Sequence, residues 1–293
     1  MNAKADIKAW RDAGCMLRFG HHEIFVRSGG RPDGPALLLI HGFPTSSWDW
    51  QPIWPELENT HHLISFDMLG FGFSDKPAGH RYSMFEQADI AQAVLRHCGA
   101  SEYHILAHDY GDTVAQELLA RDLDGPQACT LLSVCLLNGG LFPESHRLLT
   151  IQKLLLSPIG PLVARLSSRR SLAISMRNIF GPDTQPDDDL LDGFWWLLTV
   201  NDGKKCIADL IRYVRERAEF RERWVGAMQR SSRPLKLVNG PVDPISGAHM
   251  VERYRQIVPR PNITELPGIG HYPQVESPAG VAAAYREFRE SMA

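Results

Sequence analysis

The chain is poor in cysteine and contains no long hydrophobic run. Its five cysteines show no Cys-x-x-Cys spacing, which argues against a disulfide framework and a structural zinc site and is typical of a reducing compartment. No stretch reaches the roughly 18 uncharged apolar residues that a spanning helix needs. The polar N-terminal stretch lacks the apolar segment of a signal peptide. We therefore expect a cytoplasmic protein without a membrane-spanning segment.

Charge of either sign is also not in excess. The 293 residues include 31 Lys and Arg against 34 Asp and Glu, and no basic stripe or tail is present, so a nucleic-acid partner is not expected. The run Asp187-Asp188-Asp189 is better explained as a helix N-terminus than as a set of metal ligands, and we expect neither a metal nor a cofactor. Nothing in the sequence indicates an oligomeric state.

Strand and helix patterns alternate along most of the chain. Apolar runs predict buried strands at 36–40, 63–66, 103–107, 131–137, 235–238 and 263–266, and a hairpin is predicted at 15–19 and 23–27. Helical spacing occurs at 83–98, 110–121, 248–257 and 279–292. This order predicts an α/β fold with a mostly parallel, eight-stranded sheet and helices on both faces.

One long segment breaks the alternation. Residues 140–232 have helical periodicity and no convincing strand, which predicts a helical cap inserted between two parts of the core, 1–139 and 233–293. Such an insert would cover the carboxyl ends of the strands, where open α/β sheets bind ligands. The apolar stretch 148–166 predicts a pair of cap helices, with contact to a membrane surface or a partner as the alternative.

The run Ala107-His108-Asp109-Tyr110-Gly111 follows a predicted strand and opens a predicted helix. This is the context of a nucleophile elbow, a strained turn that needs small flanking residues and presents its central side chain above the sheet. The usual pattern is Gly-x-Ser-x-Gly, and here Ala replaces the first Gly and Asp the Ser. The alternative interpretation of Asp109 is an ordinary helix N-cap.

Three further segments favour the catalytic interpretation. The loop His41-Gly42-Phe43-Pro44 closes a strand and would form an oxyanion hole from the N–H groups of Phe43 and Tyr110. Asp243 follows the strand at 235–238, and His271 follows the strand at 263–266. The order nucleophile, acid, histidine is the one expected for a hydrolase of this kind. We therefore predict Asp109, Asp243 and His271 as the catalytic residues.

An aspartate in the nucleophile position determines the type of reaction. A carboxylate is already ionised at neutral pH, and its natural target is an electrophilic sp³ carbon that carries a leaving group. Attack yields an alkyl ester, which water activated by His271 would hydrolyse. Epoxide opening and carbon–halogen displacement both fit this scheme. Ordinary ester hydrolysis fits poorly, because its first step would yield an anhydride.

These motifs resemble the epoxide hydrolase and haloalkane dehalogenase branch of the α/β-hydrolases. A closer resemblance is to the mesoderm-specific transcript proteins and rests on the segments HDYGDTVAQELL, LNGGLFPESHR, NDG, RWVGA and GPVDP, which extend through core and cap. The resemblance implies the α/β-hydrolase fold and a hydrolase acting on a small, largely apolar organic substrate. An epoxide hydrolase-like activity is the first hypothesis.

The sequence departs from both enzyme types in this branch. Haloalkane dehalogenases hold the halide with a Trp after the nucleophile and an Asn or Trp after the His-Gly pair, where this chain has Tyr110 and Phe43. Epoxide hydrolases use two cap tyrosines, and Tyr213 is the only tyrosine between 140 and 232. Dehalogenation therefore loses support but is kept as an alternative, and the missing groups also suggest a second alternative, a catalytically inactive binder. Possible substrate contacts are His41, His108, Asn138, Trp195, Trp196 and Tyr213.

Overall fold

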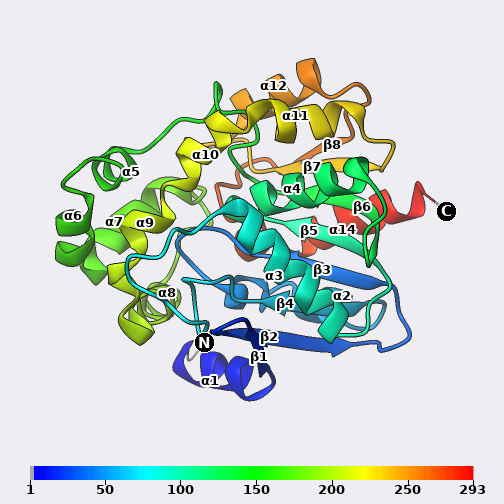
Figure 1. Ribbon diagram of the computed structural model, residues 1–293. Coiled ribbons are helices and arrows are strands. Elements are labelled where there is room, and N and C mark those ends of the chain that lie inside the picture. The colour runs from blue at the N-terminus through cyan, green and yellow to red at the C-terminus, as the bar shows by residue number, and fades with distance from the viewer. Residues whose placement is uncertain (1–2, 293) are drawn as a thin grey trace.

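Eight strands form one sheet in the order β1-β2-β4-β3-β5-β6-β7-β8 in the computed structural model, which describes residues 3–292 (Figure 1). Strands β3 to β8 run parallel, and β1 and β2 form an antiparallel hairpin at one edge. The predicted α/β-hydrolase sheet is therefore confirmed. The strands are β1 (Cys15–Phe19), β2 (His22–Gly30), β3 (Ala36–Ile40), β4 (His62–Phe66), β5 (Glu102–Ala107), β6 (Thr130–Leu136), β7 (Leu235–Asn239) and β8 (Ile263–Glu265).

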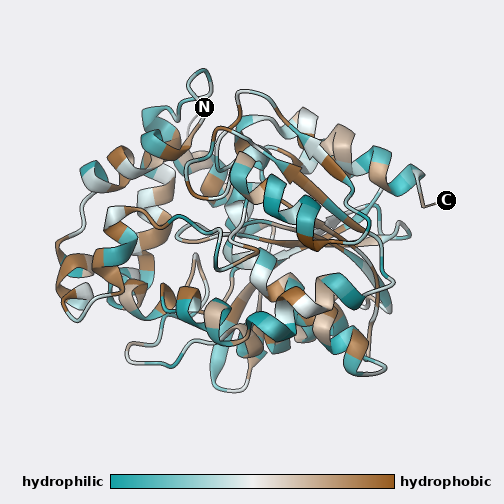
Figure 2. Ribbon diagram, turned by 90° about the horizontal axis from the view of Figure 1, so that it is seen from above, coloured by the Kyte–Doolittle hydropathy of each residue, from teal (hydrophilic) through white to brown (hydrophobic). Residues whose placement is uncertain are grey.

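Helices cover both faces of the sheet because its central strands are apolar on both sides. In β3, Leu38 and Ile40 belong to one hydrophobic cluster, whereas Leu37 and Leu39 belong to the other. Figure 2 shows the same arrangement, with brown central strands between helices that carry their teal residues outward. The first cluster is covered by α3 (Met84–His97), α4 (Tyr110–Asp124), α11 (Arg221–Arg230) and α12 (Ala248–Ile257). The second is covered by α1 (Ala3–Asp12), η1 (Ser47–Trp50), α2 (Trp54–Leu57), α13 (Pro273–Glu276) and α14 (Pro278–Glu290).

The segment between β6 and β7 is helical throughout its regular elements. Most of it lies at the end of the sheet on the left of Figure 1, whereas its last helix runs over the core at the top. Its helices are α5 (Thr150–Leu155), α6 (Gly160–Leu166), α7 (Arg169–Ile179), α8 (Asp188–Thr199), η2 (Val200–Lys205), α9 (Ile207–Leu210), α10 (Tyr213–Glu219) and α11. The last of these packs along α4, where Arg223 and Trp224 donate hydrogen bonds to the buried Glu117. The helix α11, although it lies within the predicted cap segment 140–232, therefore packs on the core, and the bounds of the cap stay a prediction.

The sequence pattern predicts one helix pair of the structure and misses another helix. The missed helix is α1, in which Ile7 and Trp10 are buried and which packs against α8 of the cap. The predicted helix pair at 148–166 is present as α5 and α6. None of the helices in residues 3–292 is long and apolar enough to cross a membrane.

Candidate active site

Asp109 occupies a strained turn between β5 and α4. Its backbone has φ 48° and ψ −102°, a region that side chains other than Gly rarely adopt and that costs free energy. The Asp109 side chain makes no capping hydrogen bond to α4. Asp109 therefore occupies the N-cap position of α4 without capping it through its side chain, and the strained turn has the geometry that is expected of a nucleophile elbow.

Two glycines, one in the Asp109 turn and one in the loop after β3, allow the close packing that this turn requires. A Cβ on Gly111 would lie 2.4 Å from the carbonyl oxygen of Ile40, so α4 can start only if that position lacks a side chain. A Cβ on Gly42 would lie 2.6 Å from Nδ1 of His108 and 3.1 Å from the Asp109 Cβ. The loop after β3 and the turn after β5 therefore touch through glycine.

This contact brings the first expected oxyanion donor to Asp109. The N–H of Phe43 donates to Oδ2 of Asp109 across 3.2 Å. Tyr110 begins α4 beside it, and among residues 3–292 no hydrogen bond joins the Tyr110 N–H to the carboxylate. The structure thus places the Phe43 N–H as expected, and the role of Tyr110 stays a prediction.

Asp243 and His271 form a tightly held pair. Oδ2 of Asp243 lies 2.8 Å from Nδ1 of His271. The same carboxylate accepts hydrogen bonds from the backbone N–H of Ile245 and from both the N–H and hydroxyl of Ser246. A fourth donor, Nδ2 of Asn138, also reaches it. Both members are buried, and the acid is fixed in the orientation that holds the imidazole.

The charges of the three residues shift one another's pKa. Burial alone would lower the pKa of His271, but the carboxylates of Asp243 and Asp109 raise it to about 8. Burial opposes ionisation of Asp243, yet His271 holds its pKa at about 2. Burial also opposes ionisation of Asp109, and His271 and Arg217 together keep its pKa below the usual range. Asp109 is therefore ionised at neutral pH in a buried position.

The cap contributes a cation that faces Asp109. Arg217, on α10, is buried and donates through Nη2 to the backbone carbonyl of Asp109 across 2.7 Å. The same Nη2 lies 3.6 Å from the Asp109 carboxylate, and Nε donates to the Thr113 hydroxyl. The Arg217 guanidinium stacks over the ring of Tyr213 at 4.4 Å. Four residues apart on α10, these two side chains share one face of the helix.

Several polar atoms near Asp109 are buried without a partner. Among residues 3–292, no hydrogen bond is made by Nη1 of Arg217, Nε2 of His146 or Nδ1 of His108. The hydroxyl of Tyr213 also has no partner of good hydrogen-bond geometry, although the side chains of Asp109 and Arg217 lie near it. The charge of Asp109 acts on the pKa of Tyr213, His146 and His108 alike, so these groups share its surroundings. Buried polar atoms are nearly always satisfied. The cluster can therefore bind oxygen atoms or an anion of a substrate.

In the motif Asn138-Gly139-Gly140, side chains from neighbouring elements leave no space for a Cβ at either glycine. A Cβ on Gly139 would lie 2.1 Å from the carboxylate of Asp112, and a Cβ on Gly140 would lie 2.3 Å from Nη1 of Arg217. The two glycines thus leave room for a buried acid from α4 and for the cap arginine. Burial and the charge of Asp109 raise the pKa of Asp112 well above its usual range.

A carboxylate joins the His271 loop to the cap. Glu276 accepts hydrogen bonds from the backbone N–H groups of Gly181, Gly270 and Tyr272 and from the hydroxyl of Thr184. In addition, the N–H of His271 donates to the carbonyl of Ile179 at the end of α7. The position of the candidate base therefore depends on the cap as well as on the core.

An apolar cavity of about 490 Å³ opens beside these residues. It ends on Phe43 and His271, the residues that flank the Asp109 carboxylate, and its other walls come mainly from α5, α6 and α7. Apolar side chains such as Leu155, Leu172 and Met176 line it. The cavity has room for a small or elongated apolar molecule whose reactive end would reach the candidate site.

The six predicted substrate contacts lie in different places. Trp195 lines the cavity, and Tyr213 lies in the polar cluster. Trp196 points away from it, is 40% exposed and packs edge-on against Phe73, because the two indoles follow each other on α8 and leave it on different faces. The prediction of a substrate contact by Trp196 is therefore wrong.

The remaining three predicted contacts make hydrogen bonds to the loops that carry the site. Asn138 binds Asp243 and both backbone polar groups of Gly240. The ring of His108 bonds to the carbonyl of His271, and His41 accepts the N–H of Met68. None of these three side chains lines the cavity. Their side-chain contacts are to protein groups, and a substrate contact by any of the three stays a prediction.

Arg217 and Glu276 contact the site residues but were not predicted from the sequence. The cap contains many arginines, so Arg217 gives no signal by itself. Its position four residues after the only cap tyrosine is the pattern that could have identified it. Glu276 lies five residues after His271 in a short helix, α13. No local pattern marks a carboxylate that binds four donors from two segments.

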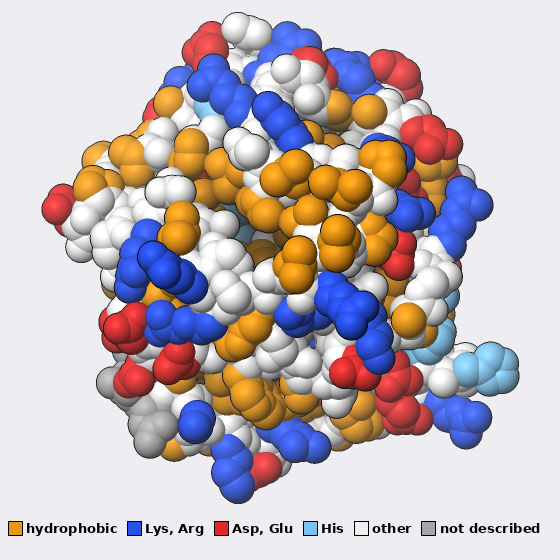
Figure 3. Space-filling model, turned by 90° about the vertical axis from the view of Figure 1, so that its left-hand side faces the viewer, with side chains coloured by type: hydrophobic (Ala, Val, Ile, Leu, Met, Phe, Trp, Pro, Cys, Tyr) orange, Lys and Arg blue, Asp and Glu red, His pale blue; other side chains and the backbone are white. Residues whose placement is uncertain are grey.

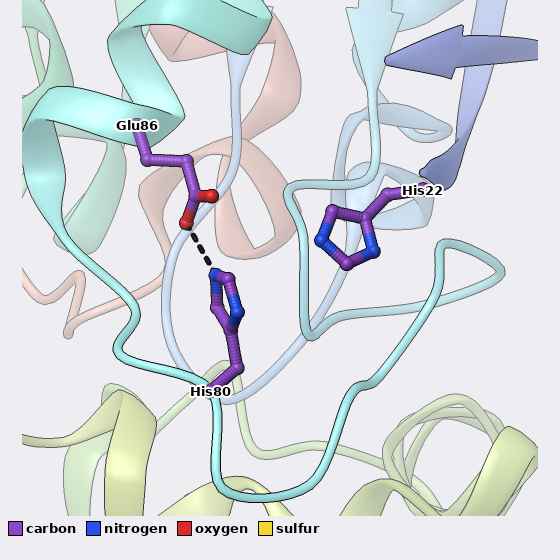
Figure 4. A group of neighbouring side chains, drawn as sticks. All are labelled: His22, His80 and Glu86. Carbon is purple, nitrogen blue, oxygen red and sulfur yellow. Dashed lines mark hydrogen bonds and ion pairs between the residues drawn. The ribbon is translucent and has the colours of Figure 1, made fainter. Parts of the chain in front are cut away.

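One cluster with metal-ligating side chains lies elsewhere. His22, His80 and Glu86 come from β2, the loop before α3 and α3, and their ligand atoms lie within 4.8 Å of one another (Figure 4). Nε2 of His80 is already 2.7 Å from the Glu86 carboxylate. The ring of His22 meets that of His80 edge-on. The pair explains how the loop is held to α3, and the expectation of a protein without a metal stays a prediction.

Comparison with known proteins agrees with this architecture. A family model described as alpha/beta hydrolase fold matches residues 35–278. The mesoderm-specific transcript homolog protein of Bos taurus is 41% identical over 297 aligned residues, which cover 97% of this chain and 88% of that protein. The resemblance stated from the sequence motifs is therefore confirmed.

Solved structures show the same fold at lower identity. The structure of the epoxide hydrolase CorEH has a TM-score of 0.78 at 15% identity and covers 96% of this chain and 99% of that one. The haloalkane dehalogenase DbeA from Bradyrhizobium elkani has a TM-score of 0.77 at 20% identity, with coverage of 95% and 99%. At these identities the likeness concerns the fold alone.

Proposed function

Because this chain belongs to the alpha/beta hydrolase fold family, we propose that it is an epoxide hydrolase-like enzyme in which Asp109 forms a covalent alkyl ester. The observation that carries the proposal is the strained backbone of Asp109, whose ionised carboxylate makes no capping bond and instead faces the Phe43 N–H. Strain of this kind persists where the surrounding structure imposes it and is concentrated at functional sites.

In the first step, an Asp109 oxygen attacks one carbon of the epoxide and the carbon–oxygen bond breaks. The electron pair goes to the epoxide oxygen, which takes the proton of the Tyr213 hydroxyl. Burial and the charge of Asp109 raise the pKa of Tyr213. Ester formation removes that charge while Arg217 stays beside the ring, so Tyr213 becomes more acidic when its proton is needed.

In the second step, water attacks the carbonyl carbon of the ester. His271, oriented by Asp243, takes a proton from this water, and the developing oxyanion faces the Phe43 N–H. Collapse releases the product oxygen, which takes the proton back from His271. The remaining water proton passes from Asp109 to the Tyr213 oxygen. The net reaction adds one water to the epoxide and gives a diol.

The cavity supports a small, largely apolar organic substrate. Its lining is mainly Leu, Ile and Val side chains from the cap, whereas the unpartnered donors of Tyr213 and Arg217 lie near the nucleophile. A substrate with an apolar body and one reactive, oxygen-bearing end matches this division.

Carbon–halogen displacement is a second candidate, favoured by one observation. Nη1 of Arg217 is buried without a partner beside the nucleophile, and such a cation could hold a departing halide. This reaction would need no proton from Tyr213. A catalytically inactive binder is the third candidate, and it predicts ligand-dependent stabilisation without turnover of either substrate type.

The deciding experiment traps the ester. His271→Gln is mixed with a panel of epoxides and bromoalkanes, and intact mass spectrometry and peptide mapping follow. We expect the mass of one epoxide to be added to the peptide that contains Asp109. The double variant Asp109→Ala/His271→Gln should gain no mass. An adduct on another residue, or unchanged turnover in Asp109→Ala, would contradict the mechanism, and bromide release with no epoxide adduct would favour the second candidate.

A further inference from the structure

The outer face of the cap exposes large apolar side chains. Five of them, at 40% to 72% exposure, lie on or next to α5, α6 and α7: Leu154, Ile159, Leu162, Leu166 and Ile174. Figure 3 views the molecule from this side and shows the hydrophobic side chains gathered around a hollow. Single exposed apolar residues are ordinary, but a gathered group marks an interaction surface.

This surface is continuous with the entrance of the apolar cavity. Leu166 is 72% exposed and Ile174 is 54% exposed, and both also line the cavity that ends on His271. Ile159 and Leu162, more than half exposed, do not line it. A molecule that leaves an apolar environment against this face can therefore pass into the cavity along a continuous apolar path.

The chain segment that carries these apolar side chains has charged residues of one sign only. Residues 145–182 contain no Asp or Glu and six basic residues, which are Arg147, Lys153, Arg165, Arg169, Arg170 and Arg177. Arg169 and Arg177 pair with acids of α8. Lys153, Arg165 and Arg170 are exposed and form no ion pair within residues 3–292. Figure 3 shows blue side chains at the margin of the apolar area.

We infer that this cap face docks on an anionic phospholipid surface and takes an apolar substrate from the lipid into the cavity. Exposed Ile and Leu side chains would enter the boundary between headgroups and acyl chains, while Lys153, Arg165 and Arg170 would bind the phosphates. A second copy of the chain is a poorer occupant, since two such faces would bring together basic residues without acids. Only the transfer of substrate rests on the proposed function, whereas docking does not.

The test measures binding of the full chain to vesicles by flotation. Vesicles of phosphatidylcholine are compared with vesicles of phosphatidylcholine and phosphatidylglycerol. We expect at least about tenfold tighter binding to the anionic vesicles, which falls as salt is raised. Ile159→Ser/Leu162→Ser should weaken binding by about tenfold or more, because two apolar side chains no longer insert. Turnover of a water-soluble epoxide should not change in this variant.

Matched variants separate the contributions. Met16→Ser removes an apolar side chain of 46% exposure from β1, away from the cap, and should bind like the parent. Lys153→Gln/Arg165→Gln/Arg170→Gln should abolish the preference for anionic vesicles. Equal binding to both vesicle types by the parent, or unchanged binding by Ile159→Ser/Leu162→Ser, would overturn the proposal. So would a dimer that this variant dissociates in sedimentation without any vesicle binding.

A last comparison keeps this proposal separate from the mechanism. Asp109→Ala should bind anionic vesicles as the parent does, because Asp109 is buried far from any lipid contact in this arrangement. If Asp109→Ala retains turnover while the parent binds vesicles, the ester mechanism fails and docking stands. If the ester forms but no vesicle binds, docking fails alone.

Discussion

The core side and the cap side of the candidate site differ in how their polar side chains are held. On the core side, Asp109, Asp243 and His271 each follow a strand of the sheet, and backbone turns and hydrogen bonds fix them. On the cap side, Tyr213 and Arg217 come from the seven-residue helix α10, and each keeps a buried polar atom without a partner. The polar groups of the three core residues are held by protein partners, including the end of α7 for His271, whereas the cap side lacks what a substrate would supply.

This difference separates two parts of the proposed reaction. Formation and hydrolysis of an ester need a carboxylate, a base and an oxyanion donor, all of which the core provides. The choice of electrophile depends on which groups face the departing atom, and these belong to the cap. Substitutions on the core side should therefore affect every substrate, and substitutions on the cap side should affect some substrates more than others.

The largest effect is expected for Asp243→Asn, on the core side. An amide cannot hold the charged imidazole, so we expect hydrolysis of the ester to slow by about 10⁴-fold. In the parent, this step needs neutral His271. The pKa of His271 is about 8 while Asp109 is charged, and the ester removes that charge, so the rate of hydrolysis should rise with pH to a limb that lies below about 8. Without the Asp243 carboxylate, the pKa of His271 falls and this limb moves to lower pH. Rapid-quench measurement of the ester tests both expectations.

The control for this variant is Ser246→Ala, which removes one hydrogen bond from the same carboxylate. It should slow hydrolysis by about tenfold or less. If Asp243→Asn slows hydrolysis no more than Ser246→Ala, the core side does not act as a unit and the comparison fails.

A smaller effect is expected for Arg217→Met, on the cap side. Loss of this cation removes one donor and should lower kcat/KM for epoxides by about 10²–10³-fold. Arg217 holds the pKa of Asp109 down, so its removal raises that pKa. The acid limb of ester formation then moves to higher pH. Stopped-flow profiles of ester formation measure this shift.

The matched control is Arg215→Met, on the exposed side of α10. It should leave both kcat/KM and the acid limb unchanged. Equal losses in the two variants would mean that the arginines act on the stability of α10 rather than on Asp109.

Next in size is Tyr213→Phe. Without its proton, epoxide opening should slow by about 10²-fold, while bromoalkanes should react at the parent rate because a halide needs no proton. Tyr254→Phe is the matched control, since Tyr254 is also buried with an unpartnered hydroxyl but lies on α12. An equal loss for both substrate types would show that Tyr213 positions the site and does not choose the electrophile.

The smallest effect on turnover is expected for Glu276→Gln, which lies between the two sides. The amide cannot replace the charged acceptor for four donors, so we expect the free energy of unfolding to fall by about 1–3 kcal/mol. Glu276 also contributes to the raised pKa of His271, and its loss should lower that pKa slightly. Urea denaturation measures the first effect, with Glu290→Gln, at the exposed end of α14, as the unaffected control.

The raised pKa of His271 also affects stability. Because the folded-state pKa of about 8 lies above the ordinary value of 6.5, protonated His271 stabilises the fold. This contribution is fully present below the ordinary value and is lost as the pH rises through about 8. Glu276→Gln should reduce this pH dependence as well as the stability itself.

The core side was predictable because strand ends carry their own signals. The run from Ala107 to Gly111, the His-Gly pair at 41 and 42 and the two loops after the last strands can each be interpreted locally. The fold class followed from the same alternation and is confirmed by the structure and by the family match. The strand bounds agree within a few residues, since apolar runs end where the sheet does.

The cap side was not predictable in the same way. Helical periodicity identified α5 and α6, but it does not say which face of a helix meets the core. Trp195 and Trp196 illustrate this, because one lines the cavity and its neighbour packs on Phe73. Arg217 is one of many cap arginines, and only its burial beside Asp109 distinguishes it. Long-range packing decides these positions, and no local pattern records it.

The hydrogen bond from the His271 N–H to the Ile179 carbonyl has a consequence for how motion can be observed. This amide can exchange its proton with solvent only when the end of α7 separates from the loop. Its exchange rate therefore reports the population of states in which the cap has lifted from the candidate base. A ligand that fills the cavity should slow this exchange. The exchange rate of the His271 amide would therefore report both the occupancy of the cavity by a ligand and the contact of the cap with the core.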